Sequence, residues 1–245
     1  MLVRGIGALS GADMDDALFA QRICETAARW PGYLGRYVRR REKAGRPIAW
    51  YEEPKLEQGA YATVLGVSLR RASGPVYSGG GVWTAAALGD SCAFQVRGER
   101  LVAAFPLASP EDFDTSPDLA GTRNPDRDLI ERRTLTRRGT WLPGDVFYLA
   151  TDAASQWFLA QDAVDGRPWR QIDAAFDDQT AWLDELRARR LIRNDDVTIV
   201  RCRLDRVDAG RAAAEADAQP EPGAEPELDA EPGPEADGGG TSEAP

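Results

Sequence analysis

The sequence predicts an α+β fold in which antiparallel strands and helices occupy separate stretches of the chain. Strand-like runs between residues 61 and 105 follow one another through short turns, as in hairpins, and the helical patterns lie before and after them. A parallel, doubly wound fold would alternate strands with helices instead. Three of the strand-like runs in the chain meet an aspartate at one end, and there is no histidine.

The first elements are predicted to be helices. The acids at 13–16 suit a helix N-terminus, and apolar residues follow at spacings of three or four as far as Trp30. Pro31-Gly32 predicts a break, after which residues 33–43 form a second helix with five basic side chains. That basic helix fits either a phosphate-binding surface or, as we prefer, a solvated helix face. A loop is expected at 50–54.

The rest of the chain is predicted to form the sheets and the helices that cover them. Strands are expected at 61–69, 82–88, 92–96, 101–105, 146–150 and 197–204, and helices at 153–160, 169–176 and 180–190. Residues 106–140 are rich in Pro, Asp and Arg and predict a long irregular insertion with one short helix near 127–133. An insertion of this length in a compact domain is more often functional than idle.

Composition divides the chain into two parts. Residues 208–245 hold eleven acids, one base and almost no aliphatic residue, so we expect a disordered acidic tail there. Residues 1–207 hold equal numbers of acids and bases, and they are long enough for one domain with a substantial core. Because the folded part lacks a basic excess, we expect no nucleic-acid partner.

Other classes of protein are disfavoured by what the sequence lacks. No segment has the length and apolarity of a membrane span, and none has the pattern of a secretory signal. We therefore expect a soluble, cytoplasmic, monomeric protein without a membrane partner. Cys24, Cys92 and Cys202 have no zinc-like spacing and are expected to act as buried small apolar side chains.

The absence of histidine restricts the chemistry that the chain can perform. It excludes Ser-His-Asp triads, Cys-His pairs and histidine metal sites. Asp90 follows the strand at 82–88, Asp152 follows the strand at 146–150, and Asp195 precedes the last strand. Because carboxylates at strand ends can gather hard oxygen ligands, these aspartates predict a site for a hard divalent metal.

Four segments resemble motifs of the protein phosphatase 2C family, the metal-dependent serine/threonine phosphatases. They are a small-residue/Thr strand at 60–64, Gly-Asp-Ser within 87–92, a strand ending in Thr-Asp at 143–152, and Asp-Asp before a Thr-containing strand at 193–200. They occur in the family's order over about residues 15–204. The resemblance implies an α-β-β-α sandwich of two antiparallel sheets and a site for two Mg²⁺ or Mn²⁺ ions. It further implies a metal-activated water that attacks phosphorus, and phosphorylated proteins as substrates.

The resemblance also assigns roles to single residues. Asp152 and Asp195 match the family's two late metal ligands, and Asp90 matches a position associated with an additional metal ion. For each of them the alternative is a turn aspartate that accepts hydrogen bonds from nearby backbone amides. Asp196 stands where the family usually has Asn, and we interpret it as a turn residue.

The chain departs from the family's pattern in three places. The residues before position 15 contain no Asp-Gly, which in the family bridges both metals, Ala153 replaces a glycine, and Gln156 stands where an acid is common. We interpret the nearest acids, Asp13, Asp15 and Asp16, as helix-start residues. The chain is therefore expected to be an N-terminally truncated or degenerate member, with N-terminal strands missing from its sheets.

Three functions remain open from the sequence. The first is a metal-dependent serine/threonine phosphatase, and the second is a catalytically inactive relative that binds phosphorylated or acidic segments. The third is a scaffold whose acidic tail recruits basic partners, although the tail is more simply a solubilising extension. An in-frame strand ending in Asp-Gly upstream of Met1 would favour the enzyme, and a stop codon there would favour the binding module.

Overall fold

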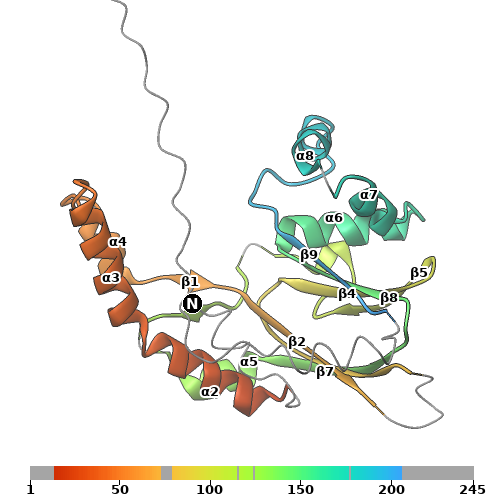
Figure 1. The fold of residues 1–245 in the computed structure, drawn as a ribbon, viewed down its shortest axis with the longest axis horizontal. Helices are drawn as coiled ribbons and strands as arrows, with labels where there is room; N and C mark the ends of the chain where they lie inside the picture. Colours follow the sequence, from red (N-terminus) through yellow and green to blue (C-terminus); the bar gives the residue numbers. More distant parts are fainter. Residues whose placement is uncertain (1–13, 73–78, 115, 124, 177, 206–245) are drawn as a thin grey trace, which may run out of the picture. The chain divides into compact units, whose positions relative to one another are not determined.

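The computed structural model describes residues 14–72, 79–114, 116–123, 125–176 and 178–205. The sandwich that they form has four layers, in the order helices, sheet, sheet, helices (Figure 1). The strand pairs described are all antiparallel, so the predicted α+β class and the α-β-β-α arrangement are confirmed. The segments expected to lack strands (1–13) and to form a disordered tail (208–245) lie outside the described residues.

The first sheet has three strands with the apolar strand at its centre. Its order is β2 (Val64–Arg71), β3 (Gly81–Leu88), β7 (Leu135–Trp141). Every residue of β3 is buried, as an uncharged run flanked on both sides by strands and on both faces by other layers requires. Helices α2 (Asp16–Ala27) and α5 (Arg127–Arg133) cover its outer face. Asp15 caps α2 by accepting the N–H of Leu18 at 2.7 Å, as the sequence predicted.

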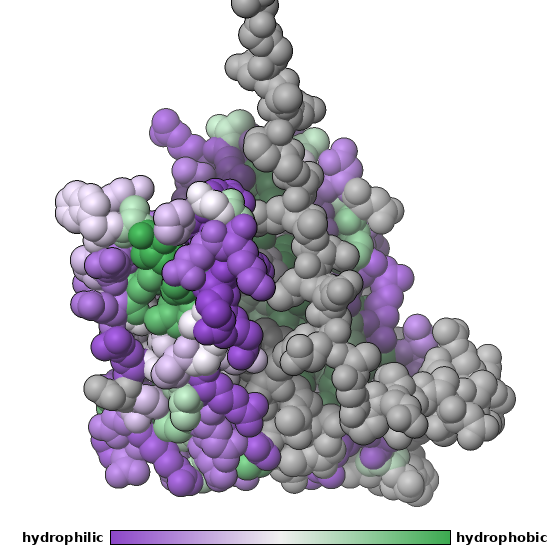
Figure 2. Space-filling model, turned by 60° about the vertical axis from the view of Figure 1, so that its left-hand side comes forward, coloured by the Kyte–Doolittle hydropathy of each residue, from purple (hydrophilic) through white to green (hydrophobic). Residues whose placement is uncertain are grey.

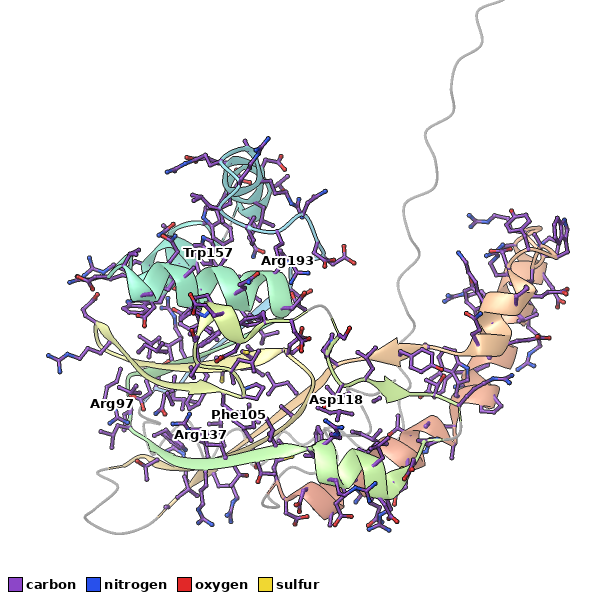
Figure 3. All side chains as sticks on the ribbon, turned by 180° about the vertical axis from the view of Figure 1, so that it is seen from behind. Arg97, Phe105, Asp118, Arg137, Trp157 and Arg193 are labelled. Carbon is purple, nitrogen blue, oxygen red and sulfur yellow. The ribbon has the colours of Figure 1, made fainter. Side chains whose placement is uncertain are left out.

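The second sheet has four strands and carries the larger helical layer. Its order is β5 (Arg100–Phe105), β4 (Cys92–Arg97), β8 (Asp145–Ala150), β9 (Ile199–Arg203). Its outer face packs against α6 (Asp152–Ala163), α7 (Pro168–Ala174) and α8 (Gln179–Ala188). Phe94 stacks on Phe158 of α6 with ring centroids 4.1 Å apart, and the neighbouring Trp157 is buried (Figure 3).

A third apolar core lies between the sheets, where Phe105 is seen in Figure 3. Trp83 of β3 packs edge-on against Phe147 of β8, and its indole N–H donates to the Gln95 amide oxygen of β4 at 2.9 Å. This buried hydrogen bond joins the two sheets and satisfies the one polar atom of the indole.

The structure corrects three predictions. Residues 135–141, expected to be irregular, form the edge strand β7, whose mostly exposed polar side chains gave no alternating pattern. Helix α3 (Trp30–Lys43) begins before Pro31, because a proline in the first turn loses no intrahelical hydrogen bond. Helix α4 (Glu53–Gln58) begins inside the expected loop. Three short elements lie in the connections: β1 (Tyr61–Ala62), β6 (Ala120–Gly121) and the 3₁₀ turn η2 (Pro110–Asp112).

Candidate functional site

Asp90 lies in the turn where the chain passes from the first sheet to the second. It follows β3 and precedes β4, and it is buried. The preceding Gly89 has φ +98°, and a Cβ there would lie 2.5 Å from Thr63 Cγ2 and 2.7 Å from the Asp118 carbonyl oxygen. Only glycine fits this turn, because it alone combines the left-handed backbone with no side chain. The turn therefore holds Asp90 at the end of the sandwich.

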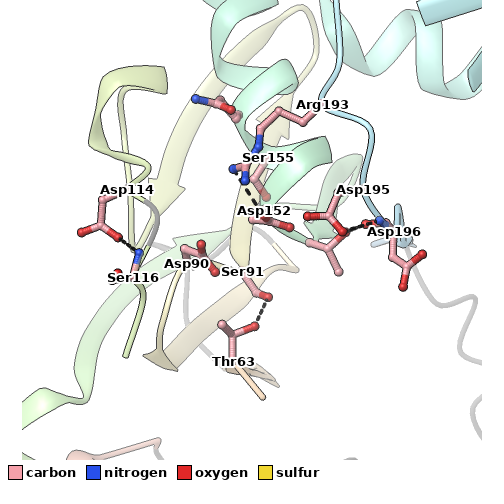
Figure 4. A network of polar contacts seen from close by, with 12 residues as sticks. Thr63, Asp90, Ser91, Asp114, Ser116, Asp152, Ser155, Arg193, Asp195 and Asp196 are labelled. Carbon is pink, nitrogen blue, oxygen red and sulfur yellow. Dashed lines mark hydrogen bonds and ion pairs between the residues drawn. The ribbon is translucent and has the colours of Figure 1, made fainter. Parts of the chain in front are cut away.

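Asp152 is brought to the same end by the neighbouring strand. It is the first residue of α6, directly after β8, and its side chain is one quarter exposed. The preceding Thr151 donates its hydroxyl to the Asp196 carbonyl oxygen at 3.1 Å and accepts the N–H of Thr198 at 3.1 Å. These two bonds tie the start of α6 to the segment before β9, which contains Asp195. The three predicted aspartates thus approach one another at one end of the sandwich (Figure 4).

The aspartates differ in what their carboxylates contact. The Asp152 carboxylate forms an ion pair with Arg193, with Oδ2 and Nη1 3.4 Å apart. The Asp195 carboxylate accepts the N–H of Asp196 at 2.8 Å, which is the turn-aspartate contact given above as the alternative for that residue. Asp196 is exposed and adjoins that turn. Asp195 is held in place through its carbonyl oxygen, to which Arg187 donates at 3.0 Å.

The electrostatic environment of Asp90 is unfavourable for a carboxylate. Burial raises its pKa most, the negative charge of Asp152 raises it further, and Asp114 adds to the effect, whereas Arg193 lowers it. A buried carboxylate whose ionisation is opposed by a neighbouring negative charge lies in a place that a cation can stabilise. Asp114, whose Oδ1 accepts the N–H of Ser116 at 2.8 Å, is drawn beside Asp90 in Figure 4.

The sequence analysis did not single out Asp114 and Arg193, which both lie at this site. Asp114 lies in the 106–140 insertion, whose unusual length was the available signal. Gln156 joins that insertion to α6 by donating to the Pro110 carbonyl oxygen at 3.1 Å, so the expected acid position has a structural contact instead. Arg193 stands directly before the Asn-Asp-Asp turn, but nothing in the pattern indicated that it would pair with Asp152.

The described residues fit one hard cation better than two. Asp90 and Asp152 offer carboxylate oxygens, and Mg²⁺ is often held by one or two carboxylates together with waters. No group of three or more Asp, Glu or Cys side chains arranged for a metal occurs among the described residues, so they do not assemble the ligand set expected for two ions. The guanidinium of Arg193 is the cation that faces Asp152 in this structure.

The cysteines do not supply a nucleophile. Burial raises the pKa of the Cys92 thiol to about 12, so the thiol stays protonated at neutral pH. Burial also raises the pKa of Cys24 and of Cys202. Cys92 is fully buried, as expected, whereas the other two are only partly buried.

A recess beside the aspartates has a cationic border. It has a volume of about 410 Å³ and is lined by Arg190, Arg193 and Gln156, with Trp157 and Ile192 among its apolar walls. Because Arg193 also pairs with Asp152, the recess and the aspartates share one residue. The arrangement places guanidinium donors beside carboxylates.

Comparison with known proteins gives three similar solved structures. No family model matches the chain, and no curated protein does. The photosystem II phosphatase PBCP is 13% identical with a TM-score of 0.38, covering 74% of this chain and 79% of that one. The phosphatase domain of SpoIIE from Bacillus subtilis is 11% identical with a TM-score of 0.38, covering 91% and 78%. PppA, a regulatory component of T6SS in Pseudomonas aeruginosa, is 15% identical with a TM-score of 0.26, covering 63% and 58%.

Two of these neighbours are phosphatases by name. With identities of 15% or less and TM-scores below 0.5, these likenesses assign nothing to this chain, and both the fold and the roles of single residues rest on the contacts described above. No helix of the described residues is long and apolar enough to cross a membrane.

Proposed function

We propose that this chain is a metal-dependent phosphatase that hydrolyses phosphoserine and phosphothreonine in proteins. The observation that carries the proposal is the convergence of Asp90, in the turn before β4, and Asp152, directly after the paired strand β8, at the end of the sandwich that also bears the cationic recess. Carboxylates that hold a hard cation, next to guanidinium groups that bind phosphoryl oxygens, are the parts that phosphoryl transfer to water requires.

Each residue has a defined task in this proposal. Asp90 and Asp152 would hold a Mg²⁺ or Mn²⁺ ion, which when bound supplies Lewis-acid stabilisation of charge on the phosphoryl group. Arg193 and Arg190 line the recess and would bind phosphate oxygens through their planar, always charged guanidinium groups. Asp195, predicted as a further metal ligand, would approach the ion from the turn that the contacts of Thr151 and Arg187 hold beside α6.

The test is a Mn²⁺ titration of the full chain by calorimetry, with hydrolysis of p-nitrophenyl phosphate followed in parallel. Asp152→Asn and Asp90→Asn should each weaken Mn²⁺ binding by at least about ten-fold and reduce turnover, because each removes a charged ligand. Asp165→Asn is the matched control, since this exposed carboxylate lies at the far end of α6. Equal Mn²⁺ affinity in the wild-type chain and the three variants would contradict the assignment of Asp90 and Asp152 as metal ligands.

A second function, a binding module without hydrolysis, has its own supporting observation. Arg193 already neutralises Asp152, and the described residues do not assemble three metal ligands. In that case a phosphoserine peptide should bind the full chain without being hydrolysed, and Arg193→Gln should weaken binding at least ten-fold. Hydrolysis that depends on Mn²⁺ would decide for the enzyme.

A further inference from the structure

The side chain of Arg193 lies between two places that the proposed function uses differently. Its guanidinium forms an ion pair with Asp152, with Nη1 and Oδ2 3.4 Å apart, and its side chain also lines the recess of about 410 Å³. Figure 4 shows this side chain reaching toward Asp152 from the segment before β9. In the proposed function Asp152 would hold a metal ion, whereas the recess would bind phosphate oxygens. One guanidinium therefore faces both binding positions.

The ion pair between Arg193 and Asp152 is long and partly exposed to solvent. Its side chains are 45% and 25% exposed, and its 3.4 Å separation exceeds the roughly 2.7–2.9 Å of a charge-assisted hydrogen bond. The pair between Arg97 and Asp145 differs on both counts, because Arg97 donates two hydrogen bonds at 2.8 Å to a carboxylate that is 1% exposed. Exposed ion pairs contribute little to stability. The Arg193 guanidinium can therefore leave Asp152 without unfolding the site.

Only the side chain of Arg193 has to move for such an exchange. The Arg193 carbonyl oxygen accepts the N–H of Asp195 at 3.0 Å, and the preceding Ile192 is buried. Before them, the N–H of Leu191 donates to the Leu186 carbonyl oxygen at 2.9 Å, a bond typical of the end of a helix. These contacts fix the backbone on both sides of Arg193. A change of side-chain rotamer is therefore enough to carry the charge from Asp152 toward the recess.

A metal ion and the Arg193 guanidinium compete for the same carboxylate. Both are cations, so each opposes the binding of the other at Asp152. The charge of Arg193 also acts on Asp90: burial and the Asp152 charge raise the pKa of Asp90, whereas Arg193 lowers it. An anion in the recess would attract the same guanidinium, because Arg193 lines the recess. An anion that draws Arg193 away thus leaves both acids to another cation.

We propose that Arg193 is an exchangeable counter-ion, which neutralises Asp152 until a phosphate group in the recess draws it away and leaves the carboxylate to a metal ion. The inference rests on the proposed function for the places of the metal ion and the phosphate, and it adds a coupling between them. By linkage the coupling is reciprocal, so bound phosphate favours the metal ion and the bound ion favours phosphate. A phosphorylated substrate would in this way complete the metal site that acts on it.

Arg190 provides a matched control for Arg193 in the same recess. It follows α8 with φ +55°, and its exposed guanidinium forms no hydrogen bond or ion pair with another described residue. Hydrophilic residues cover much of the surface seen in Figure 2, so a change of charge can alter ion binding through the general field alone. Removing the charge of Arg190 measures that general effect, because the same charge is lost from the same recess without loss of a contact to Asp152.

The first test titrates Mn²⁺ into the full chain by calorimetry in the absence of phosphate. Arg193→Gln should bind Mn²⁺ at least about three-fold more tightly than the wild type, because the competing cation is gone. Arg193→Lys, which keeps the charge, should stay close to the wild-type affinity. Arg190→Gln should tighten binding by less than about 1.5-fold, since its charge is screened by solvent. Both arginines are exposed, so the variants should keep the wild-type circular dichroism and melting temperature.

The second test uses no metal and titrates inorganic phosphate into the full chain after treatment with EDTA and dialysis. Asp152→Asn should bind phosphate at least about three-fold more tightly than the wild type, because Arg193 is released to the recess. Asp195→Asn is the control, since it removes a nearby exposed charge whose carboxylate bonds to the N–H of Asp196 instead. It should tighten phosphate binding by less than about 1.5-fold.

Three outcomes would overturn the inference. Equal tightening of Mn²⁺ binding by Arg193→Gln and Arg190→Gln would be a general charge effect. Unchanged or weaker Mn²⁺ binding by Arg193→Gln would mean that Arg193 does not compete with the ion. Equal phosphate affinities of Asp152→Asn and Asp195→Asn would mean that Asp152 does not hold Arg193 back from the recess.

Failure of the proposed function gives a different result. In that case neither the wild type nor any variant binds Mn²⁺, which contradicts the metal site itself. The phosphate titration then decides by itself whether Arg193 exchanges between Asp152 and the recess.

Discussion

The paired strands β4 and β8 carry aspartates at both of their ends, and the two ends differ in how the carboxylate charge is balanced. Asp145 begins β8 opposite Arg97, and it is 1% exposed. At the other end β4 begins after Asp90, which is 9% exposed, and β8 leads into Asp152. Figure 3 shows Arg97 and Arg193 at these two ends.

The Asp145 end is electrostatically complete. Arg97 donates to both carboxylate oxygens at 2.8 Å, Gln95 donates at 2.7 Å, and the N–H of Leu142 donates at 2.9 Å. Burial opposes ionisation of this carboxylate, but the donors from Arg97, Leu142 and Gln95 outweigh burial and lower its pKa. The Asp90 end has the reverse balance, since burial and the Asp152 charge together raise the pKa of Asp90. The Asp145 end therefore stabilises the fold. The Asp90 end destabilises it, because its carboxylate charge is not balanced in the same way.

The largest expected effect on stability comes from removing the charge of Asp145. Asp145→Asn should lower the free energy of unfolding by about 2–4 kcal/mol, because it removes a charge-assisted pair and sets an amide N–H₂ against other donors. Urea unfolding followed by tryptophan fluorescence measures the loss. Asp165→Asn, on a highly exposed carboxylate, should change stability by less than about 0.5 kcal/mol. A loss below about 1 kcal/mol for Asp145→Asn would contradict the contrast between the ends.

The second effect is the stabilisation of the folded chain by Mn²⁺ bound at the Asp90 end. At 100 times its dissociation constant, Mn²⁺ should stabilise the wild-type chain by about 2.7 kcal/mol, because it binds the folded state only. Thermal unfolding with and without Mn²⁺ detects the shift, and Asp152→Asn should lose most of it. A shift of the same size in that variant would place the ion elsewhere.

The third effect is the pH dependence of stability that Asp145 contributes. In the unfolded chain an aspartate titrates at about pH 3.9. Because the folded pKa of Asp145 is lower, its stabilisation is complete well above that value and is lost as the pH falls through the folded pKa. The difference in unfolding free energy between wild type and Asp145→Asn should therefore narrow below about pH 4. A difference that is constant from pH 7 to pH 3 would mean that the charge of Asp145 contributes nothing.

The smallest effect on stability comes from removing the buried charge of Asp90. Asp90→Asn should raise the unfolding free energy of the metal-free chain by roughly 0.5–1 kcal/mol at pH 7, since a buried charge that faces Asp152 is removed. The sign follows from the raised pKa: the folded state is penalised above that pKa and not below the unfolded value. The gain should thus disappear at low pH, where Asp90 is protonated in both states. A loss of stability at pH 7 would show that Asp90 is a structural residue like Asp145.

The predicted site residues differ in how well the sequence could place them. Asp90 and Asp152 were predictable as strand-end carboxylates, because each follows a buried strand and a glycine or threonine of recognisable type, whereas the pairing of β4 with β8 makes them neighbours. The ion pair between Asp152 and Arg193 was not, since the two residues are far apart in the chain and meet only through the Thr151 contacts between β8 and the segment before β9. Asp195 matched a ligand motif in sequence, yet its carboxylate also fits the backbone turn it occupies.

What the sequence determined by itself was local: which runs form most of the strands and helices, where Asp15 starts a helix, and that histidine chemistry is excluded. Hydrophobic period, turn residues and capping act within a few positions, so they can be read from neighbours in the chain. The tertiary structure decided which acids are neutralised and which are not. It also decided that β7 becomes a strand and that the apolar face of α3 is only partly buried by the described residues. Those outcomes depend on strand pairing and packing between distant segments, which local pattern does not encode.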